Sequence, residues 1–559
     1  MLIKLDVFGG IAPKIPAARL PGTMAQKAVN VRFERPVLES FRGLQNVSGS
    51  PPANSKTIFR YKSSSGNAWM SSPSPDARFA MATLVSDPWD YMLFAAPDYP
   101  RITRSDYATN GGPPYPSTSY RLGVPQPPAP ISLSVGRRTD NGEEVNLDPD
   151  FDTRASVSYR ISFVDGFGRE GPLSDPSEIV SYYPEKEFIT VGLRSISTWP
   201  SAPPSGTFVT GAKVRIYRSI DGTFRFVGEV FATASTFVDQ VFDDSAGLPA
   251  ETDGWFGPPD DDSSVNPGGT LRNLAPMPGG FFVGSSGFEL CASVPDAPHA
   301  WPYRLPLADP ITGIVSTGNA AVVATTGPTY VVQGVDPAAL NPTQINTNQS
   351  CVSARSMVNV NGAVIYASPD GLVGVIGYDA QLLTEELVTK EEWQAIFKPQ
   401  EIHAYYYEGK YIFFNDTKGW IFKPGKGQNS LSELSFVATA GYADLQDDSL
   451  YLMVGGQLRK FDSHSTRMDY EWQSKLFRLD TPTNFSYLQV LADSYPVTVE
   501  FTFTKMNGAT ATVSRTVNSI EPVYMPGGYT YNQMVARAQG TTPIKTIALA
   551  HDKSEFDYA

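Results

Sequence analysis

The chain has 559 residues, more than one hydrophobic core accommodates, so at least two domains are expected. Its 41% hydrophobic and 18% charged residues exclude wholesale disorder and coiled coil, and 12% aromatic residues with 47 glycines and 47 prolines favour short strands joined by tight turns. The net charge of −13, without a dense run of lysine and arginine, excludes the basic stripe of a tight nucleic-acid binder. We therefore predict an all-β protein.

The N-terminal region, residues 1–130, is predicted to form a β segment and the first blade or blades of a repeat domain. Residues 78–84 and 91–95 are apolar stretches typical of the two strands of a hairpin. Residues 111–130 are rich in proline, which cannot continue a sheet ladder, so they are expected to form a linker. The opening residues differ from a signal peptide, and no run of about 18 apolar residues occurs, so neither secretion nor a membrane span is expected.

Residues 131–262 are predicted to form a separate β-sandwich inserted into the repeat domain. Apolar and polar residues alternate over 157–164 and 212–218, and each run ends in a glycine-containing turn. A second turn-rich and acidic break follows at residues 255–269. The stretch 163–177, together with Ile-Tyr-Arg-Ser at 216–219, resembles the fibronectin-III-like domains often inserted in phage virion proteins.

Residues 263–470 repeat a pattern of apolar strand, glycine-containing turn and second apolar strand. The paired strands are 280–284 with 288–290, 320–324 with 329–332, 363–367 with 372–376, 411–414 with 420–422, and 449–454 with 458–461. The turn glycines Gly327, Gly371, Gly419 and Gly455 are 44, 48 and 36 residues apart. Because propeller blades repeat every 40–50 residues or so, we predict the remaining blades of a β-propeller here. A succession of unrelated meanders is the alternative interpretation.

One helix and a C-terminal domain complete the predicted elements. Thr389 and Glu392 have capping-box spacing, and Pro399 follows closely enough to end a short helix. Beyond the propeller, residues 471–559 are predicted to form a C-terminal β-sheet or sandwich domain. Strands are expected at 485–490, 497–503 and 511–517, where apolar residues alternate with polar ones.

Few residues are candidates for catalysis or metal binding. The four histidines are His299, His403, His464 and His551, and the sequence lacks a Gly-x-Ser-x-Gly elbow, a phosphate-binding Gly-Lys-Ser/Thr loop, a His-Glu-x-x-His motif and a dinucleotide-binding glycine fingerprint. We expect His299, within Pro-His-Ala-Trp-Pro, to be a hydrogen-bonded structural histidine, and Cys291 and Cys351 to be buried small hydrophobic residues. The sequence therefore predicts that the protein is not an enzyme, with no catalytic, cofactor-binding or metal-binding residues and no cofactor.

Two clusters imitate functional sites. Residues 148–152, Asp-Pro-Asp-Phe-Asp, resemble the start of a calcium-binding EF-hand loop, but its twelfth position is Tyr159, so we expect an acidic surface loop. The tyrosines at 405–407 beside Glu408 are a candidate for the mouth of a propeller-type glycosidase, which needs converging carboxylates or a tyrosine with acids. Packing of aromatic residues on a blade strand is the interpretation we favour for that cluster.

Several short segments resemble a known family. They are residues 8–13 (Phe-Gly-Gly-Ile-Ala-Pro), 28–30, 38–44, 298–302 before 311–314, 330–334, 368–371, 388–393, 485–490 and 495–497. Together they resemble the tail-nozzle and packaged-DNA stabilisation proteins of short-tailed, podovirus-type bacteriophages. That family supplies no catalytic residues, and this chain differs from its larger members in length and in the proline-bounded insert.

The resemblance implies a structural virion protein. Such a subunit forms a homohexameric ring around the DNA exit channel, helps to retain packaged DNA and conducts it during ejection. It is made in the cytoplasm of the bacterial host and resides in the virion tail. Implied partners are the adaptor and portal-proximal proteins, tail fibres or spikes, and viral DNA that passes without sequence-specific binding. The alternatives are a propeller-type tail protein that binds or degrades host glycans, acting in receptor binding, and a surface adhesin.

Overall fold

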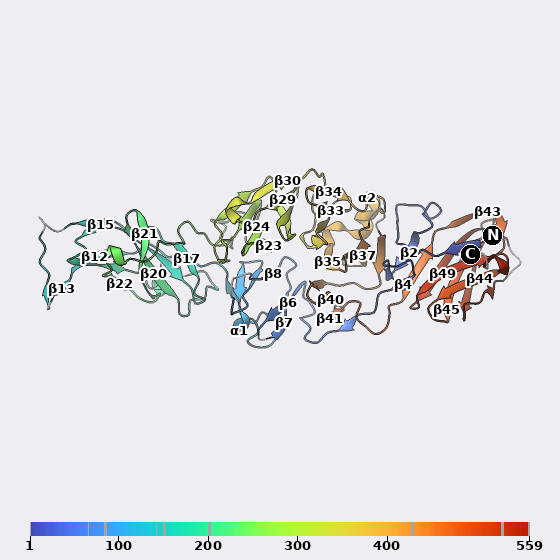
Figure 1. The fold of residues 1–559 in the computed structure, drawn as a ribbon, viewed down its shortest axis with the longest axis horizontal. Helices are drawn as coiled ribbons and strands as arrows, with labels where there is room; N and C mark the ends of the chain where they lie inside the picture. Colours follow the sequence, from blue (N-terminus) through green and yellow to red (C-terminus); the bar gives the residue numbers. More distant parts are fainter. Residues whose placement is uncertain are drawn as a thin grey trace.

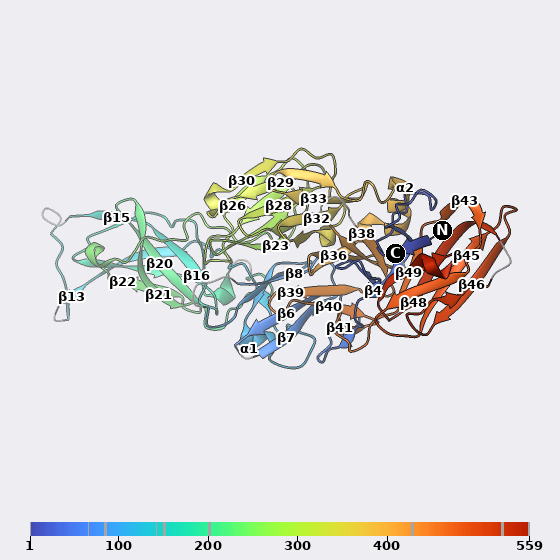
Figure 2. The same ribbon diagram turned by 45° about the vertical axis from the view of Figure 1, so that its right-hand side comes forward.

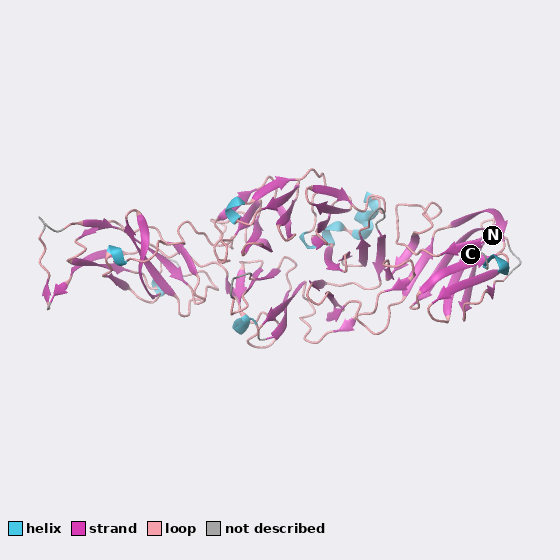
Figure 3. Cartoon of the chain, in the orientation of Figure 1, coloured by secondary structure: helices cyan, strands magenta, loops and turns pink. Residues whose placement is uncertain are grey.

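The protein is built almost entirely of β-strands, as predicted (Figure 3). The computed structural model describes residues 2–64, 66–82, 87–140, 142–148, 153–199, 203–425, 430–526 and 530–556. Three parts follow one another along the long axis, with the inserted sandwich at one end and both chain termini at the other (Figure 1). No helix in these ranges is long and apolar enough to cross a membrane.

The middle part is a propeller-like ring of small antiparallel sheets, most of them four-stranded meanders. The sheets are β6 (Thr57–Ser63) and β7 (Gly66–Ser72); β8 (Arg78–Met81), β9 (Met92–Ala95), β10 (Arg101–Thr103) and β11 (Tyr120–Arg121); β23 (Arg272–Met277), β24 (Phe281–Ser286), β25 (Glu289–Ala292) and β26 (Tyr303–Pro306); β27 (Ile311–Ser316), β28 (Ala320–Thr325), β29 (Thr329–Gln333) and β30 (Asn341–Gln344); β31 (Val358–Val360), β32 (Ala363–Ala367), β33 (Leu372–Ile376) and β34 (Asp379–Leu382); β35 (His403–Tyr407), β36 (Lys410–Phe414), β37 (Gly419–Lys423) and β38 (Ser430–Leu434); and β39 (Ala440–Asp444), β40 (Ser449–Val454), β41 (Gln457–Lys460) and β5 (Gln45–Asn46).

These sheets close into a ring through their first strands. In the described ranges, β6, β8, β23, β27, β31, β35 and β39 each contact the next, and β39 contacts β6 again. Figure 2 labels four of these strands, β6, β8, β23 and β39, in the middle part. The strand pairs that the sequence predicted as hairpins are hydrogen-bonded neighbours. The last blade is completed by β5 from the N-terminal segment, which pairs with β41. The ring therefore closes with a strand taken from the other end of the chain.

The insert is a two-sheet sandwich that leaves the ring after β11 and returns to it before β23. One sheet contains β12 (Ser132–Arg137), β19 (Glu187–Gly192) and β22 (Thr236–Asp239), and the other contains β16 (Tyr159–Val164), β17 (Glu170–Leu173), β20 (Lys213–Ile220) and β21 (Thr223–Phe231). Two short pairs accompany them, β13 (Thr139–Asp140) with β14 (Glu143–Glu144) and β15 (Ala155–Val157) with β18 (Val180–Tyr182). Ile161 and Ile216 from one sheet share a core with Ile189 and Val191 from the other, which is the packing of a β-sandwich.

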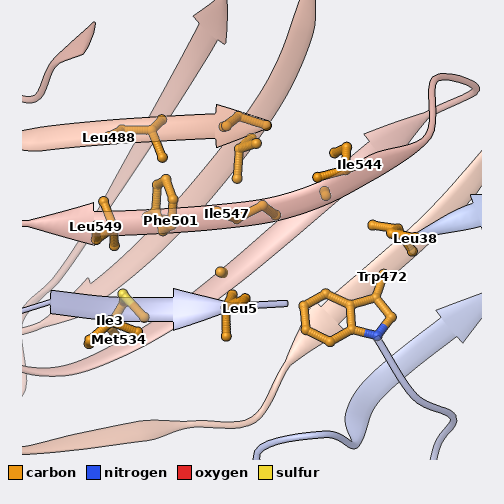
Figure 4. Packing of buried hydrophobic residues seen from close by; sticks show 14 of the residues in the cluster. Ile3, Leu5, Leu38, Trp472, Leu488, Phe501, Met534, Ile544, Ile547 and Leu549 are labelled. Atoms are coloured by element: carbon orange, nitrogen blue, oxygen red, sulfur yellow. The ribbon is translucent and has the colours of Figure 1, made fainter. Parts of the chain in front are cut away.

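The C-terminal part contains two sheets that share one core (Figure 4). One contains β1 (Leu2–Leu5), β49 (Ile544–Ala550), β44 (Tyr487–Ala492) and β47 (Val523–Tyr524), and the other contains β2 (Ala25–Val29), β42 (Tyr470–Ser474), β43 (Phe477–Thr483), β45 (Val497–Thr504), β46 (Thr510–Val517) and β48 (Tyr531–Gly540). The short strands β3 (Val31–Arg32) and β4 (Glu39–Ser40), which follow β2 in the chain, pair with each other. Because β2 also pairs with β38, the second sheet continues into a propeller blade.

The strands of residues 1–130 are divided among several sheets. Residues 1–130 do not form one unit, because β1 and β2 belong to the C-terminal sheets while β5 belongs to the last blade. Ile3 and Leu5 are buried in the C-terminal core beside Leu488 and Ile547 (Figure 4). Only from β6 onward does the segment build propeller sheets of its own.

Helical structure is sparse. The described helical turns are α1 (Ser105–Ala108), α2 (Lys390–Glu392), a π-helix at Trp393–Phe397, and 3-10 turns at Ile196–Thr198, Asp243–Ser245, Pro337–Ala339, Ala354–Ser356, Pro399–Glu401 and Lys553–Phe556. The predicted capping box is confirmed: Glu392 donates its backbone N–H to Thr389 Oγ1 at 3.2 Å, and Thr389 donates its own to Glu392 Oε2 at 2.9 Å. The helix then widens into the π-helix and ends at Lys398, whose φ is +51°.

Candidate functional site

A small cavity lies where the first strands of the propeller converge. Its volume is about 130 Å³, and it is lined by Lys56, Thr57, Arg78, Ile314, Val315, Ala354, Arg355, Met357, His403, Ala404, Tyr405 and Gly441. These residues come from β6, β8, β27, β35 and β39 or from the turns that precede β6 and β31. The cavity therefore lies on the ring axis, the usual place of the central channel in a propeller.

Three cations face this axial cavity. Arg78 Nη2 donates to the carbonyl of Ala354 at 3.2 Å, so its guanidinium reaches from β8 to the turn before β31. Arg355 Nη2 donates to the carbonyls of Lys56 at 2.7 Å and Thr439 at 3.2 Å, on the opposite side of the ring. The lining contains no aspartate and no glutamate. The axis therefore carries a local positive charge on a chain whose net charge is −13.

His403 and Tyr405 complete the polar wall of the cavity. His403 Nδ1 lies 2.9 Å from the Tyr405 hydroxyl. Burial, and then the charges of Arg355 and Lys56, hold the pKa of His403 well below its usual range, and burial raises the pKa of Tyr405. Both side chains are therefore neutral at pH 7. A Cβ at Gly441 would lie 2.8 Å from the Tyr405 ring, so glycine is needed for the ring to occupy this place.

A larger cavity of about 620 Å³ lies at the junction between the insert and the propeller. It is lined by residues of the propeller, of the insert and of both linkers, including Tyr99, Arg121, Arg160, Asp253, Trp255, Phe256, Asp260, Glu289 and Arg304. Arg121 bonds Asp260 at 3.1 Å and Asp261 at 2.8 Å, and its guanidinium lies 3.8 Å from the centre of the Tyr99 ring. This contact joins the strand that leaves the propeller to the linker that returns to it.

Two further arginines at the junction cavity also pair with carboxylates. Arg160 bonds Asp253 at 2.7 Å, and Arg304 lies 3.7 Å from Glu289. Asp253, Asp260 and Glu289 thus each have an arginine partner within the protein, while Asp262, which also lines the cavity, accepts a hydrogen bond from Ser264. The junction cavity thus lies between two parts that ion pairs join, whereas the axial cavity is lined by cations and by no carboxylate.

His299 is a structural histidine at the same junction, as the sequence predicted. Its Nε2 donates to the backbone carbonyl of Glu170 at 2.8 Å, which links the propeller to β17 of the insert. Its ring also meets Trp255 edge-on, with centroids 5.8 Å apart. Burial, with a smaller effect of the Arg169 charge, lowers the pKa of His299 to about 3. The imidazole is neutral at pH 7 and holds the two parts together.

The remaining histidines and the cysteines do not assemble a nucleophilic site in the described ranges. His464 Nδ1 lies 2.8 Å from Thr466 Oγ1, and His551 Nδ1 lies 3.0 Å from the carbonyl of Asn484, both at the surface. Cys291 and Cys351 are free and buried, and burial raises their pKa to about 11 and about 12. They are buried small residues, as expected, and their thiols stay protonated at neutral pH.

The tyrosine cluster at 405–407 is dispersed by the structure. Tyr405 faces the axis, Tyr406 donates to Asn361 Oδ1 at 3.2 Å, and Tyr407 donates to Asp462 Oδ2 at 3.1 Å. Glu408 lies in the turn between β35 and β36 and bonds Arg32 at 2.6 Å and Lys410 at 3.1 Å. Glu408 therefore joins the N-terminal segment to the propeller and does not line either cavity.

Most of the EF-hand-like segment, residues 149–152, lies outside the described residues. In the described part of the chain, no group of three or more histidine, cysteine, aspartate or glutamate side chains is placed to hold a metal ion.

The three axial cations were missed in the sequence because they lie far apart along the chain. Lys56 directly precedes β6, Arg78 is the first residue of β8, and Arg355 lies in the turn before β31. All three residues lie at the start of a blade. An alignment of the blade sequences on their first strands would therefore have revealed these cations.

Comparison with known proteins gives no family for this chain. No family model matches it, and no curated protein matches it. Solved structures give distant similarities, among them BBS1N in complex with ARL6DN (10% identity, 75% of this chain and 97% of that chain, TM-score 0.28) and the N-terminal domain of Nup159 (10%, 58% and 86%, TM-score 0.25). Hsv2 of Kluyvelomyces marxianus is 8% identical over 48% of this chain and 69% of that chain, with a TM-score of 0.24. TM-scores this low carry no argument about function.

Proposed function

We propose that the chain is a structural subunit of a bacteriophage tail nozzle, forming a ring around the channel through which DNA leaves the virion. The observation that carries the proposal is the placement of the segments that resemble the nozzle family. Two of them, residues 8–13 and 28–30, lie at contacts that hold the N-terminal segment, the propeller and the C-terminal part together.

The glycine pair of the opening segment illustrates this placement. A Cβ at Gly9 would lie 2.2 Å from the carbonyl oxygen of Thr23, and one at Gly10 would lie 2.5 Å from that of Leu431. Only glycine permits such close backbone approach. The preceding Phe8 packs edge-on against Trp472, with ring centroids 5.0 Å apart. The matched residues are therefore needed where the first residues pass between the propeller and the C-terminal part.

Two further matched segments hold neighbouring elements in the same way. Asn30, at a φ of +57°, donates to the Asp469 carbonyl at 2.7 Å and to Ser435 Oγ at 3.0 Å. Trp393 Nε1 donates to the carbonyl of Ser368 at 2.8 Å, so two segments that resemble the family contact each other. Proteins that share a fold keep the residues whose contacts shape that fold. The contacts that these matched residues make therefore support the resemblance.

The physical properties of the subunit suit a ring around DNA. Heterologous side-to-side contacts between identical subunits must close into a ring or continue as a filament. We propose a homohexamer that contacts adaptor and portal-proximal proteins and the tail fibres or spikes. A net charge of −13 repels phosphate, so DNA slides past such a wall without adsorbing to it.

Mass measurement of the purified protein, with electron microscopy of the particles that contain it, tests this proposal. We expect closed rings of six copies, a position on the axis of the distal tail, and weak binding to free duplex DNA. A protein that stays monomeric at high concentration, or that lies only on the flank of the tail, would contradict the nozzle proposal.

The junction cavity favours a second candidate, a tail protein that binds host glycans. Its volume of about 620 Å³ and its aromatic residues Trp255 and Phe256 suit a sugar ring stacked on an aromatic face. The measurement is saturation-transfer NMR with host polysaccharide fragments, comparing the wild type with Trp255→Ala. Loss of a saturable signal in the variant would favour glycan binding over the nozzle.

We also propose that the chain has no turnover of its own. A glycosidase needs two converging carboxylates, one of them kept protonated by an apolar setting. No carboxylate lines the axial cavity, and three of the carboxylates at the junction, Asp253, Asp260 and Glu289, each face an arginine. Screens on glycans, esters and nucleotides should show no activity. Polysaccharide cleavage lost on Glu408→Gln or Tyr406→Phe would contradict this.

A further inference from the structure

We propose that the axial cavity is a binding site for one tetrahedral oxyanion, phosphate or sulfate, held by Lys56, Arg78 and Arg355. This inference rests on the cavity and its charges, and it is independent of the proposed role in a tail.

The absence of counter-ions is the first argument. Within the described ranges, no carboxylate lies within ion-pair distance of Lys56, Arg78 or Arg355. Asp76, two residues before Arg78, pairs instead with Arg272 at 3.5 Å and does not line the cavity. Three cations around one confined space repel one another, and a bound anion removes that repulsion.

The same blade shows how this protein satisfies basic residues elsewhere. Arg60 and Lys62, further along β6 than Lys56, both bond Asp444, at 3.0 Å and 2.7 Å, on the neighbouring strand β39. Asp447 supplies a second partner to Arg60. At the interface between these two blades, carboxylates thus neutralise Arg60 and Lys62 but not Lys56, which lines the axial cavity. An anion bound in the axial cavity would supply the negative partner that Lys56 lacks.

The guanidinium groups are positioned before any ligand arrives. Carbonyl oxygens of other blades hold Nη2 of Arg78 and Nη2 of Arg355. Each guanidinium has five N–H donors in a fixed fork, so these contacts leave donors for a ligand. Lys56 is exposed at the rim and carries a flexible ammonium group. Two fixed forks and one mobile cation are a suitable set for an oxyanion with several acceptor atoms.

The size of the cavity selects the class of ligand. A volume of about 130 Å³ exceeds the roughly 10–15 Å³ that one ordered water needs, so the cavity has room for a small ion. A phosphate or sulfate ion fits this space. The neutral His403 and the Tyr405 hydroxyl add polar groups without adding a negative charge. The site is therefore matched to a small dianion in charge and in volume.

A bound oxyanion would contact three parts of the ring at once. Lys56 precedes β6, Arg78 opens β8 and Arg355 precedes β31, so one ion contacts three parts of the ring. A ligand that binds only the folded state stabilises it, and the effect grows as the ligand concentration rises above the dissociation constant. We expect the ion to raise the unfolding temperature of the propeller.

Calorimetric titration and thermal unfolding of the full chain with inorganic phosphate or sulfate test the inference. Ionic strength is kept constant with potassium chloride, and acetate serves as the monoanionic comparison. We expect one saturable phosphate per chain and a rise in unfolding temperature that acetate does not reproduce. Absence of saturable binding up to about 10 mM phosphate would overturn the proposal, since weaker binding is no specific site.

The variants Lys56→Gln and Arg78→Gln should weaken phosphate binding at least tenfold each. The matched control is Lys545→Gln, a surface lysine paired with Asp493 in the C-terminal part, which should bind as the wild type does. Lys56→Gln keeps the test decisive if an arginine variant does not fold, because the Lys56 side chain is exposed and its carbonyl stays. Wild-type affinity in Lys56→Gln and Arg78→Gln would show that binding occurs elsewhere.

A competition experiment distinguishes the sources of the oxyanion. A short oligonucleotide with a 5′-phosphate and the same oligonucleotide without it are added to the phosphate complex. Competition by the phosphorylated form alone assigns the site to a terminal phosphate group that protrudes into the cavity. No competition by either form assigns it to the free ion.

Discussion

Arg218 and Asp239 form an ion pair in the interior of the inserted sandwich, with Nη1 and Oδ2 2.6 Å apart and side chains 1% and 0% exposed. The Tyr159 hydroxyl donates to the same oxygen of Asp239 at 2.7 Å. Arg218 and Tyr159 lie in one sheet and Asp239 in the other. The pair therefore connects the two layers of the sandwich through a buried polar contact.

Removing one partner of this pair should destabilise the insert strongly. Arg218→Met leaves the Asp239 carboxylate buried without its cation, which costs about 3–5 kcal/mol. We expect faster amide exchange in strands β16 and β20, measured by hydrogen-exchange mass spectrometry, with the C-terminal strands unchanged. The control is Lys213→Gln on the same strand, whose exposed pair with Glu229 contributes about 0–1 kcal/mol. Equal exchange in both variants would contradict the prediction.

Truncating Phe8 should destabilise the C-terminal part. Its ring is 3% exposed and packs against Trp472, so Phe8→Ala leaves a cavity and costs about 3–5 kcal/mol. Chemical denaturation followed by tryptophan fluorescence and by exchange in β42 and β49 measures the loss. Met506→Ala, a change at a side chain 77% exposed, is the control and should shift neither signal. A C-terminal part unaffected by Phe8→Ala would show that the opening segment only rests on its surface.

Local patterns in the sequence predicted the hairpins well, and long-range pairing is what they missed. The strands at 320–324 and 329–332 are neighbours in sequence, so alternation and a turn glycine suffice to pair them. The pairing of β1 with β49 or of β5 with β41 has no local signal, because Leu2 and Ala550 meet only after the whole chain has folded. A two-residue strand such as β5 also falls below any periodicity test.

Acid should weaken the contact between the insert and the propeller. The pKa of His299 is about 3 in the folded protein against an ordinary value of 6.5, so the unfolded state binds the proton more readily. The stability contributed by neutral His299 is complete above pH 6.5 and is lost progressively as the pH falls towards 3. Between pH 7 and pH 5 the loss is about 2 kcal/mol. Thermal unfolding across this range, with proteolysis of the linkers, measures it.

His299→Gln should reduce this acid sensitivity while lowering stability at pH 7. His403, whose pKa is also lowered by burial, still protonates on unfolding and keeps part of the dependence. The exposed His551 supplies the control, and His551→Gln should leave the pH profile as it is in the wild type. An identical slope in His299→Gln and the wild type would exclude His299 as a source of the effect.

Deleting the insert should leave a folded remainder. The boundaries 131–250 are preferable to 131–262 because Asp260 and Asp261 hold Arg121 at the end of β11 and close the gap between the linkers. The insert has a core of its own, so the propeller and the C-terminal part lose mainly the junction contacts. Circular dichroism and a cooperative unfolding transition check the outcome. Global unfolding of the shortened chain would mean that the sandwich is integral to the ring.

As with the fold, the sequence predicted those parts of the candidate sites that depend on local motifs and missed those that depend on long-range contacts. The sequence placed His299 and the two cysteines correctly, because their environments follow from short motifs and burial preference. Arg78 and Arg355 meet only through closure of the ring, and 277 residues separate them in the sequence. The capping box at Thr389 was local and visible, whereas the π-helix that follows depends on how Trp393 and Phe397 pack on the blade beneath them.

Closure of the ring by β5 has a consequence for biosynthesis. β5 ends at Asn46 and its partner β41 begins at Gln457, so the ribosome adds about 400 residues before the pair can form. At about 5–20 residues per second, the N-terminal strand waits on the order of 20–80 seconds with its hydrogen-bonding edge unpaired. The earlier blades emerge during this interval as an open arc with apolar faces uncovered at both ends. Such an arc is a natural substrate for cellular chaperones, and nascent chains stalled before residue 457 should bind them more strongly than released full-length chains.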